Sequence, residues 1–288
     1  MDFQEFRKKS LVPGNVVSTP FEHFEIVEVH KEAKNIKTLV IESEKIAKTA
    51  KPGQYMVLIR PMYDINPMSF SLIDRDKNLV GTTFRVVGDS TQEYAELRKN
   101  DKLPIQFAPR GNGFSLRGDR ILCIGGGIGI GPLASLIDEA YSRDIKIDCI
   151  AGFGTRDEVI FQNRLSEKTK LYVTTDDGTL GQKGTVLSVL DRLKLDYDSV
   201  YSCGPEIMMY KVFQHTEKYG LDAQFSLERY IRCGVGLCGS CVIDDLRICS
   251  DGPIFSSDQL RNSKDFGKHK KDLDMRTIPI EQQYSKFK

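Results

Sequence analysis

The sequence predicts an antiparallel β barrel, then an α/β domain with a doubly wound parallel sheet, and finally a small C-terminal loop module. Three observations lead to this prediction. Residues 21–105 contain short strand-like segments, strands and helices alternate after Asp119, and four cysteines gather between Cys233 and Cys249. Short strands separated by turns are typical of small barrels, and alternating strands and helices are typical of parallel sheets.

Length and composition fit a globular protein of two domains with a small third module. Of the 288 residues, 40% are apolar and 28% are charged. The formal charge of +1 gives no argument for nucleic acid. No apolar run approaches the ~20 residues of a membrane span, and the start lacks an apolar targeting core. We therefore expect a cytoplasmic protein, in a compartment that keeps thiols reduced.

The expected division has five parts. They are an N-terminal extension (1–20), a barrel (21–116), an α/β domain (117–223), a cysteine module (224–260) and a basic tail (261–288). We interpret the tail as solvated and partly ordered, with a partner-docking segment as the alternative.

Turn residues such as Pro52-Gly53 and Gly88-Asp89 separate the strands of the barrel. A short helix is expected at Thr91–Lys99, with Thr91 as a candidate N-cap. The expected strands are His23–His30, Thr38–Ile41, Gln54–Ile59, Ser69–Ile73, Leu79–Val87 and Lys102–Phe107.

The α/β domain begins with a buried strand at Arg120–Ile124, a glycine-rich loop and a helix at Pro132–Ser142. Pro132 suits an early helical position, where its missing N–H is not needed. The remaining strands are expected at Lys146–Ala151, Leu171–Thr174 and Ser199–Ser202, and the remaining helices at Asn163–Glu167, Thr185–Leu193 and Pro205–Tyr219.

Two segments of this domain suggest a dinucleotide site. Gly125-Gly126-Gly127-Ile-Gly129-Ile-Gly131 joins a strand to a helix, so its amides could bind a pyrophosphate. Its spacing departs from G-x-G-x-x-G, and a tight structural turn is the alternative. Cys203-Gly204-Pro205 follows the last predicted strand, at the sheet edge where α/β proteins bind ligands.

The cysteine quartet carries the strongest chemical signal in the chain. Cys233, Cys238 and Cys241 have the C-x4-C-x2-C spacing of plant-type [2Fe-2S] ligation, and Cys249 supplies a fourth thiolate. Glycines between them let the backbone wrap closely around a cluster. The alternatives are a structural zinc site and unliganded thiols. Cys123 and Cys149 lie in apolar runs and are expected to be buried strand residues.

The order of these features resembles the ferredoxin–NADP reductase superfamily, and within it the electron transfer subunits of NAD-dependent dihydroorotate dehydrogenase. The resemblance covers about residues 21–259. Four segments carry it, namely Asn66-Pro67-Met68-Ser69-Phe70-Ser71, Val86-Val87-Gly88-Asp89-Ser90-Thr91, Pro109-Arg110-Gly111-Asn112-Gly113-Phe114 and Phe225-Ser226-Leu227-Glu228-Arg229-Tyr230.

The resemblance implies three cofactors and no catalytic residue in this chain. FAD would be bound by Asn66, Pro67, Met68, Ser69, Gly88 and Thr91, with Ser69 near the flavin N5. NAD(H) would be bound by Gly125, Gly126, Gly127, Cys203, Gly204 and Pro205. The [2Fe-2S] cluster would be bound by Cys233, Cys238, Cys241 and Cys249.

The resemblance also implies a partner, an FMN-containing catalytic subunit, and a heterotetramer of two copies of each subunit. Electrons from dihydroorotate would pass through the cluster and FAD to NAD+, in pyrimidine biosynthesis. NAD is favoured over NADP because Arg156 is followed directly by Asp157 and Glu158.

Two departures from the family pattern stand out. Asn66 occupies the place of an arginine that pairs with flavin phosphate, and Arg60, Arg75 or Arg85 could supply the charge instead. The gap from Cys241 to Cys249 is shorter than the family leads us to expect.

Three other functions remain open. The chain could serve a sulfide dehydrogenase, a ferredoxin-linked transhydrogenase or a soluble hydrogenase. Some relatives in those complexes replace one ligand cysteine with aspartate, whereas all four are cysteine here. It could be a stand-alone flavin reductase that acts on a diffusible acceptor. A zinc-stabilised binding module without flavin is the non-enzymatic alternative.

Overall fold

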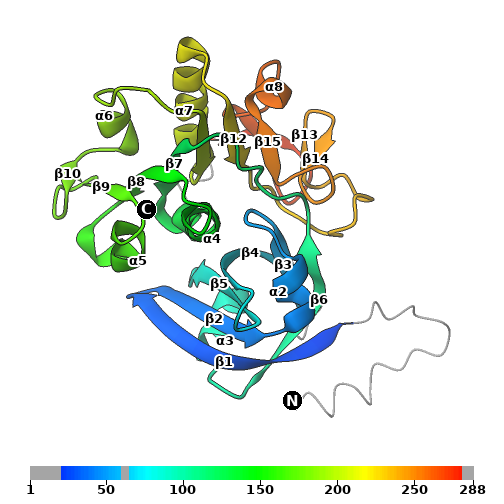
Figure 1. Ribbon diagram of the computed structural model, residues 1–288. Helices are drawn as coiled ribbons and strands as arrows, with labels where there is room; N and C mark the ends of the chain where they lie inside the picture. Colours follow the sequence, from blue (N-terminus) through cyan, green and yellow to red (C-terminus); the bar gives the residue numbers. More distant parts are fainter. Residues whose placement is uncertain (1–20, 60–64, 281–288) are drawn as a thin grey trace, which may run out of the picture.

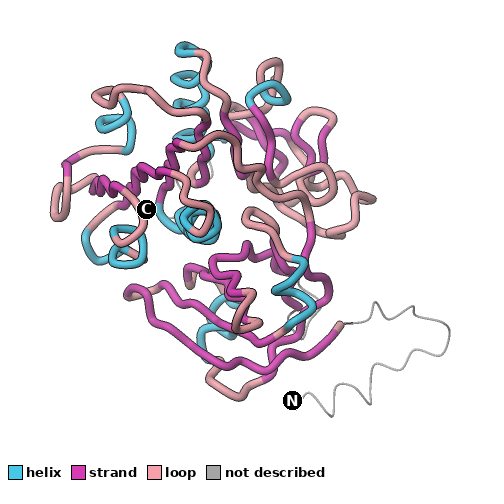
Figure 2. The backbone as a smooth tube through the Cα atoms, in the orientation of Figure 1, coloured by secondary structure: helices cyan, strands magenta, loops and turns pink. Residues whose placement is uncertain are grey.

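The computed structural model describes residues 21–59 and 65–280, and Figures 1 and 2 show their arrangement. The barrel occupies one end of the molecule, and the larger sheet lies above it in the view of Figure 1. The cysteine loop and the C-terminal hairpin lie beside the larger sheet, on the side away from β9 and β10.

The predicted antiparallel barrel is confirmed. Its strands close in the order β1-β2-β5-β4-β3-β6. Their bounds are Glu22–Ala33 (β1), Ile36–Glu42 (β2), Tyr55–Ile59 (β3), Ile65–Asp74 (β4), Leu79–Arg85 (β5) and Lys102–Arg110 (β6). Alternating residues of β3 face opposite ways, because Met56 and Leu58 pack inside the barrel while Tyr55 and Val57 pack outside it.

Two helices of the barrel domain differ from the prediction. Helix α2 (Glu44–Thr49) was not expected, and it buries Ile46 and Ala47 behind an N-cap at Ser43. Helix α3 spans Asp89–Glu96, so the expected N-cap at Thr91 is wrong. The helix begins one turn earlier because the Thr91 hydroxyl folds back and accepts hydrogen bonds from the amides of Val87 and Gly88, at 2.9 and 3.0 Å.

The doubly wound sheet is also confirmed, and it has seven strands in the order β10-β9-β8-β7-β11-β12-β15. Six of them run parallel, and only β15 pairs antiparallel with its neighbour. The strands are Arg120–Gly126 (β7), Lys146–Phe153 (β8), Lys170–Thr175 (β9), Gln182–Lys183 (β10), Ser199–Cys203 (β11), Ala223–Ser226 (β12) and Ile254–Ser256 (β15).

Helices cover both faces of this sheet, as the alternation of elements predicts. They are the 3-10 turns Gly127–Gly129 (η1) and Arg156–Glu158 (η2), and helices Ile130–Tyr141 (α4), Gln162–Ser166 (α5), Val186–Leu190 (α6) and Glu206–Tyr219 (α7). Helix α4 is buried over most of its length, because it lies between the sheet and the barrel. Pro132 is its third residue, close to the expected position.

The cysteine loop leaves the sheet after β12 and returns to it at β15. It contains the hairpin Val242–Ile243 (β13) and Leu246–Arg247 (β14). After β15 come helix Ser257–Leu260 (α8) and a second hairpin, His269–Lys271 (β16) and Thr277–Pro279 (β17).

The interpretation of residues 261–288 as a solvated tail is wrong for the described part of this segment. Phe266 is buried, and its ring lies 5.6–5.8 Å from the rings of Tyr210, Phe213 and Phe225. Ile280 is buried as well. The segment packs against α7 and completes the core on that side of the sheet.

Candidate functional site

The two glycine-containing segments of the α/β domain meet at one place. Strand β7 pairs with β11 so that Gly125 lies opposite Cys203. A Cβ at Gly129 would lie 2.5 Å from the Cys203 carbonyl oxygen, and a Cβ at Gly204 would lie 2.9 Å from the Gly126 nitrogen. Side chains at these positions would therefore separate the loop from the Cys203-Gly204-Pro205 turn.

This meeting point is the topological switch of the sheet. Strands β8, β9 and β10 follow β7 in the chain and lie on one side of it in the sheet. The chain then crosses over, and β11 and β12 lie on the other side of β7. Crevices at the carboxyl ends of such strands are where open α/β sheets bind ligands. Helix α4 begins at the same edge, although in its first turn the Ile130 amide already donates to the 3-10 turn before it and Pro132 has no N–H.

The barrel packs directly onto the helix that follows the glycine loop. The Ser135 hydroxyl in α4 donates to the Phe70 carbonyl in β4 at 3.0 Å. A Cβ at Gly131 would lie 3.6 Å from that of Ser71. Strand β4, which carries the predicted flavin segment, therefore borders the switch point.

The two predicted flavin segments also lie together. Asn66 in β4 donates to the Tyr94 hydroxyl of α3 at 3.1 Å, and α3 begins directly after Gly88. A Cβ at Gly88 would meet no atom within 4 Å. The Ser69 side chain is half-buried in β4 and lies opposite Tyr55, on the outer face of the wall, whereas Asn66 lies opposite Leu58, on the inner face.

Two of the three arginines considered as substitutes for Asn66, Arg75 and Arg85, already have protein partners. Arg85 pairs with Glu158 across the two domains, with 2.6 Å between Nη1 and Oε1. Arg75 donates to the Ala50 carbonyl at 2.9 Å and pairs with Glu139. Arg60 lies outside the described residues. Of the two that are described, Arg85 borders the loop, since its Nη2 would lie 3.8 Å from a Cβ on Gly127.

Acidic side chains gather at the carboxyl ends of β8 and β9, and of these Glu158 was noted in the sequence whereas Asp176 and Asp177 were missed. Glu158 accepts from the Gly154 amide at 3.0 Å, and the Asp176 amide donates to the Phe153 carbonyl. Burial, together with the charges of Glu158 and Asp177, raises the pKa of Asp176. Asp176 and Asp177 follow β9, and this position at a strand's carboxyl end was the signal available to sequence reasoning.

The cysteine loop directs backbone amides at its own sulfur atoms. The amides of Val235 and Leu237 lie 3.5 and 3.4 Å from the Cys233 Sγ. The Gly236 amide donates to the Cys249 Sγ at 3.2 Å. Gly234, Gly236 and Gly239 all have positive φ, between 66° and 80°, as expected for glycines that turn the backbone around a cluster.

The four thiols approach one another in two pairs. Burial disfavours the Cys233 thiolate, but hydrogen bonds from the Val235, Cys238 and Leu237 amides and from the Cys238 thiol outweigh it, so its pKa falls to about 6. Burial, followed by a hydrogen bond to Cys241, raises the pKa of Cys249 to about 12. Four thiols on one loop provide the number and kind of donors that a [2Fe-2S] cluster requires. Over residues 21–59 and 65–280, no three His, Cys, Asp or Glu side chains converge as ligands of one ion.

Comparisons with known proteins agree with this architecture. Residues 228–261 match the family described as the iron–sulfur cluster binding domain of dihydroorotate dehydrogenase B. A relative from Methanothermobacter thermautotrophicus, named a probable dihydroorotate dehydrogenase B (NAD(+)) electron transfer subunit, is 38% identical over 90% of this chain and 97% of its own. A relative of that subunit from Streptococcus mutans is 32% identical, over 83% of this chain and 97% of its own.

The chain belongs to the family of dihydroorotate dehydrogenase B electron transfer subunits.

Solved structures place this family member among ferredoxin reductase folds. An NADH-dependent reduced ferredoxin–NADP oxidoreductase superposes with a TM-score of 0.75 and 26% identity, over 86% of this chain and 90% of that one. The ferredoxin reductase of a carbazole 1,9a-dioxygenase superposes with a TM-score of 0.60 at 17% identity, over 70% of this chain and 67% of that one, which shows the fold alone.

The surface of this family member near the cysteine loop is apolar. The Leu237 side chain is 85% exposed, and Tyr230, Val235 and Leu273 are exposed beside the loop or in the hairpin that contacts it. Cys238 is exposed too, whereas Cys241 and Cys249 are buried. The first of the two thiol pairs therefore lies nearer the surface than the second.

The remaining cysteines are not part of this loop. Cys123 and Cys149 are fully buried on neighbouring strands, as predicted, and burial raises the pKa of Cys149 to about 12. Cys203 is partly buried at the end of β11, and burial raises its pKa to about 12 as well. Neither shift favours a reactive thiolate.

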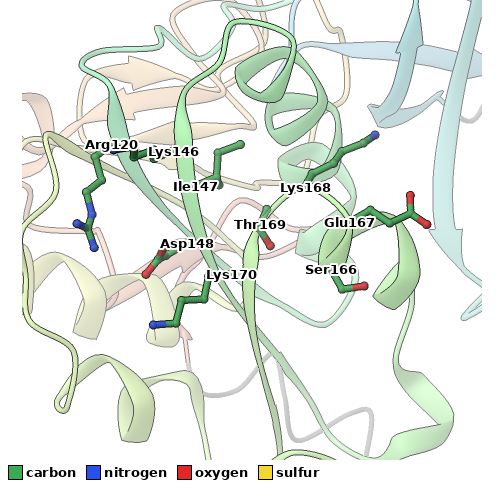
Figure 3. A pocket seen from close by; sticks show the side chains of 9 residues that line it. All are labelled: Arg120, Lys146, Ile147, Asp148, Ser166, Glu167, Lys168, Thr169 and Lys170. Atoms are coloured by element: carbon green, nitrogen blue, oxygen red, sulfur yellow. The ribbon is translucent and has the colours of Figure 1, made fainter.

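A cavity of about 480 Å³ lies at the opposite edge of the sheet (Figure 3). It is lined by Arg120, Lys146 and Asp148 near the amino ends of β7 and β8, and by residues 166–170. The glycine loop and the cysteines are at other places in the fold, so this cavity is not the nucleotide site. No helix within the described ranges has the length and apolar character of a membrane span.

Proposed function

We propose that the chain is the electron transfer subunit of a dihydroorotate dehydrogenase, passing electrons from a catalytic subunit through a [2Fe-2S] cluster and FAD to NAD+. The observation that carries this proposal is the convergence of the flavin segment of β4, the glycine loop and the cysteine loop around one face of the barrel. The domain assignment follows, with FAD on residues 21–116, NAD(H) on 117–223 and the cluster on 224–260.

The cluster would be held by Cys233 and Cys238 on one iron and by Cys241 and Cys249 on the other. The amides of residues 235–237 would stabilise the negative charge of the sulfur atoms. The contact between Gly236 and Ser250, where a Cβ would lie 3.1 Å from the Ser250 hydroxyl, keeps that loop narrow.

FAD would be held along strand β4 of the barrel. Asn66, Pro67, Met68 and Ser69 would line the flavin. Gly88 and Thr91, which are hydrogen-bonded to each other, would shape the start of α3, where the backbone would bind the pyrophosphate. The Asn66 side-chain amide donates to the Tyr94 hydroxyl, which holds this residue beside α3. The Ser69 hydroxyl would orient the ring by a hydrogen bond.

NAD(H) would bind at the switch point. Gly125, Gly126 and Gly127 would approach the pyrophosphate, and Cys203, Gly204 and Pro205 would border the nicotinamide. Glu158, Asp176 and Asp177 add negative charge at the edge where a 2′-phosphate would lie, which supports NAD over NADP.

When bound, these groups exchange two electrons between flavin and nicotinamide and single electrons between flavin and cluster. The chain itself contributes orientation and shielding. Helix α4 and strand β4 hold the two domains together through the Ser135–Phe70 hydrogen bond, and Arg85 and Glu158 close the edge of the crevice.

The partner is a catalytic subunit that contains FMN, and it docks over the exposed cysteine pair, in a heterotetramer with two copies of each chain. The apolar side chains of Tyr230, Val235 and Leu237 beside Cys238 support this surface, because apolar groups at the centre of a patch are typical of stable interfaces. A partner docked at this surface would bring its electron-donating FMN close to Cys238, the exposed ligand of the cluster.

The test is an anaerobic absorption spectrum of the chain co-expressed with a dihydroorotate dehydrogenase catalytic subunit. Bleaching of flavin and cluster bands by dihydroorotate, reversed by NAD+, is the expected result. Bleaching by NADH but not by dihydroorotate would contradict the partner and favour a ferredoxin-linked transhydrogenase, the class of the structure that superposes at a TM-score of 0.75.

A further inference from the structure

Two barrel side chains reach out of the barrel and bind the two ends of the cysteine loop. The Tyr55 hydroxyl in β3 donates to the Cys249 carbonyl at 3.0 Å. The Arg110 guanidinium at the end of β6 donates to the Gly234 carbonyl at 2.9 Å. One acceptor belongs to the last ligand, and the other adjoins the first.

These two side chains form a unit within the sheet. Tyr55 and Arg110 are register partners on the neighbouring strands β3 and β6. Tyr55 is 3% exposed and packs with Val57 against Cys241 and Cys249, in a core that the barrel shares with the cysteine loop. The Tyr55 hydrogen bond is therefore shielded from water, which strengthens it, and the Arg110 hydrogen bond is partly shielded.

On its other side Tyr55 is paired with the predicted flavin residue. Tyr55 lies opposite Ser69 in the β3–β4 ladder, so both side chains leave the same face of the barrel wall. The position assigned to the flavin and the residue that contacts the Cys249 backbone are thus direct cross-strand neighbours.

We infer that Tyr55 and Arg110 are positioning residues that fix the cluster against the flavin-binding wall and so set the rate of electron transfer between them. This inference rests on the proposed function, since it requires FAD at Ser69 and a cluster on the four cysteines. Electron transfer depends on how the two centres are spaced, and small displacements in an active site lower rates strongly. Neither residue contacts the place assigned to NAD(H).

The experiment uses the full-length holoprotein mixed anaerobically with NADH in a stopped-flow spectrometer. We expect Tyr55→Phe and Arg110→Met each to slow the cluster-reduction phase on the order of tenfold, the effect of about one lost hydrogen bond. The flavin-reduction phase should keep its wild-type rate. Arg110→Lys, which retains a donor, should restore much of the cluster phase. The double variant should be slower than either single one.

Tyr201→Phe is the matched control, because it also removes a buried tyrosine hydroxyl that donates to a carbonyl, that of Ser115 at 2.9 Å. Both phases should be normal in this control. Electron paramagnetic resonance of the reduced cluster should show a changed signal in Tyr55→Phe and an unchanged one in Tyr201→Phe.

An unchanged cluster phase in the double variant, or equal slowing of both phases, would overturn the inference. Failure of the proposed function would look different, because wild-type protein would then lack iron, lack flavin or give no bleaching with NADH. Tyr55→Phe keeps the aromatic ring and the packing, so it tests the role of the hydroxyl without emptying the core.

Discussion

Glu206 and Arg229 form a buried ion pair that joins the turn after β11 to the segment leading into the cysteine loop. The side chains are 6% and 2% exposed, and Arg229 Nη2 donates to Glu206 Oε1 at 2.8 Å. The Gly267 amide donates to the same oxygen at 2.8 Å, and Arg229 also donates to the His269 carbonyl. Three segments distant in sequence are thus fixed at one point beside Pro205.

The first prediction concerns this pair. Arg229→Met should lower the free energy of unfolding by about 3–5 kcal/mol, because it leaves a buried carboxylate without its partner. The double variant Glu206→Gln, Arg229→Met should recover part of that loss. Urea unfolding of each variant measures the effect. Glu25→Gln, which breaks the exposed pair with Lys102, should change stability by less than ~1 kcal/mol. Equal losses for both pairs would contradict the argument.

Cys238→Ser should remove the cluster while NADH still reduces the flavin. Serine is a poor ligand for iron in a site built from thiolates. Coupled turnover with the catalytic subunit should be abolished. Iron content and the absorption spectrum are the measurements. Cys149→Ala, a buried cysteine outside the loop, is the control and should keep its cluster. Wild-type coupled turnover in Cys238→Ser would rule out the proposed electron path.

Ser69→Ala should slow flavin reduction by NADH by roughly tenfold, since the ring loses a hydrogen bond that orients it. The cluster spectrum should be unaltered. Stopped-flow absorption after mixing with NADH gives the rate. Ser142→Ala, which removes an exposed hydroxyl that donates to the Glu139 carbonyl, provides the comparison. A normal reduction rate in Ser69→Ala would remove this residue from the flavin site.

Glu158→Gln should shift the preference for NADH over NADPH by about tenfold toward NADPH, the effect of roughly 1.4 kcal/mol. The substitution removes a negative charge and releases the Arg85 guanidinium, which could then meet a 2′-phosphate. The ratio of kcat/KM for the two nucleotides is the measurement. Glu167→Gln, near the amino ends of the strands, should leave the ratio unchanged. An unchanged ratio in Glu158→Gln as well would exclude Glu158 as a determinant.

His215 predicts a pH dependence of stability. Burial lowers its pKa below the ordinary 6.5 despite Asp191 at 3.6 Å. As the pH falls below about 6.5, the unfolded chain binds the proton first, so stability declines until the pH reaches the folded pKa. His215→Gln should therefore lose less stability than wild type between about pH 7 and pH 5. His23→Gln, at an exposed position, should follow wild type. Parallel pH curves for all three proteins would refute the prediction.

Local sequence signals predicted most of the fold. The six barrel strands and the parallel strands β7, β8, β9 and β11 were found because apolar runs and glycine turns mark them, whereas the short parallel strands β10 and β12 were missed. The glycine loop and the Cys203 turn were placed correctly at strand ends, and the structure brings Gly125 opposite Cys203. Cys123 and Cys149 were buried as their apolar neighbours indicated.

Features that depend on distant contacts could not be predicted in this way. Strand β15 follows the cysteine loop and joins the sheet through long-range pairing with β12. Phe266 is a core residue because its ring packs against Tyr210 and Phe213 of α7, which lie far from it in the sequence. Thr91 carries a good capping side chain, yet that side chain bonds backward to residues 87 and 88 instead of starting the helix. Short polar side chains allow both arrangements.

The return of the chain to the main sheet at β15 has a consequence for how the protein acquires its metal. Ser226 and Ile254 are register partners, so strand pairing joins both ends of the segment 227–253 without the help of the cysteines. The entropy of closing this loop is therefore lost during folding of the sheet and not during metal uptake. The iron–sulfur cluster is then assembled on a cysteine loop that is already folded. Protein from which the iron has been removed should regain its cluster from ferrous ion and sulfide without unfolding.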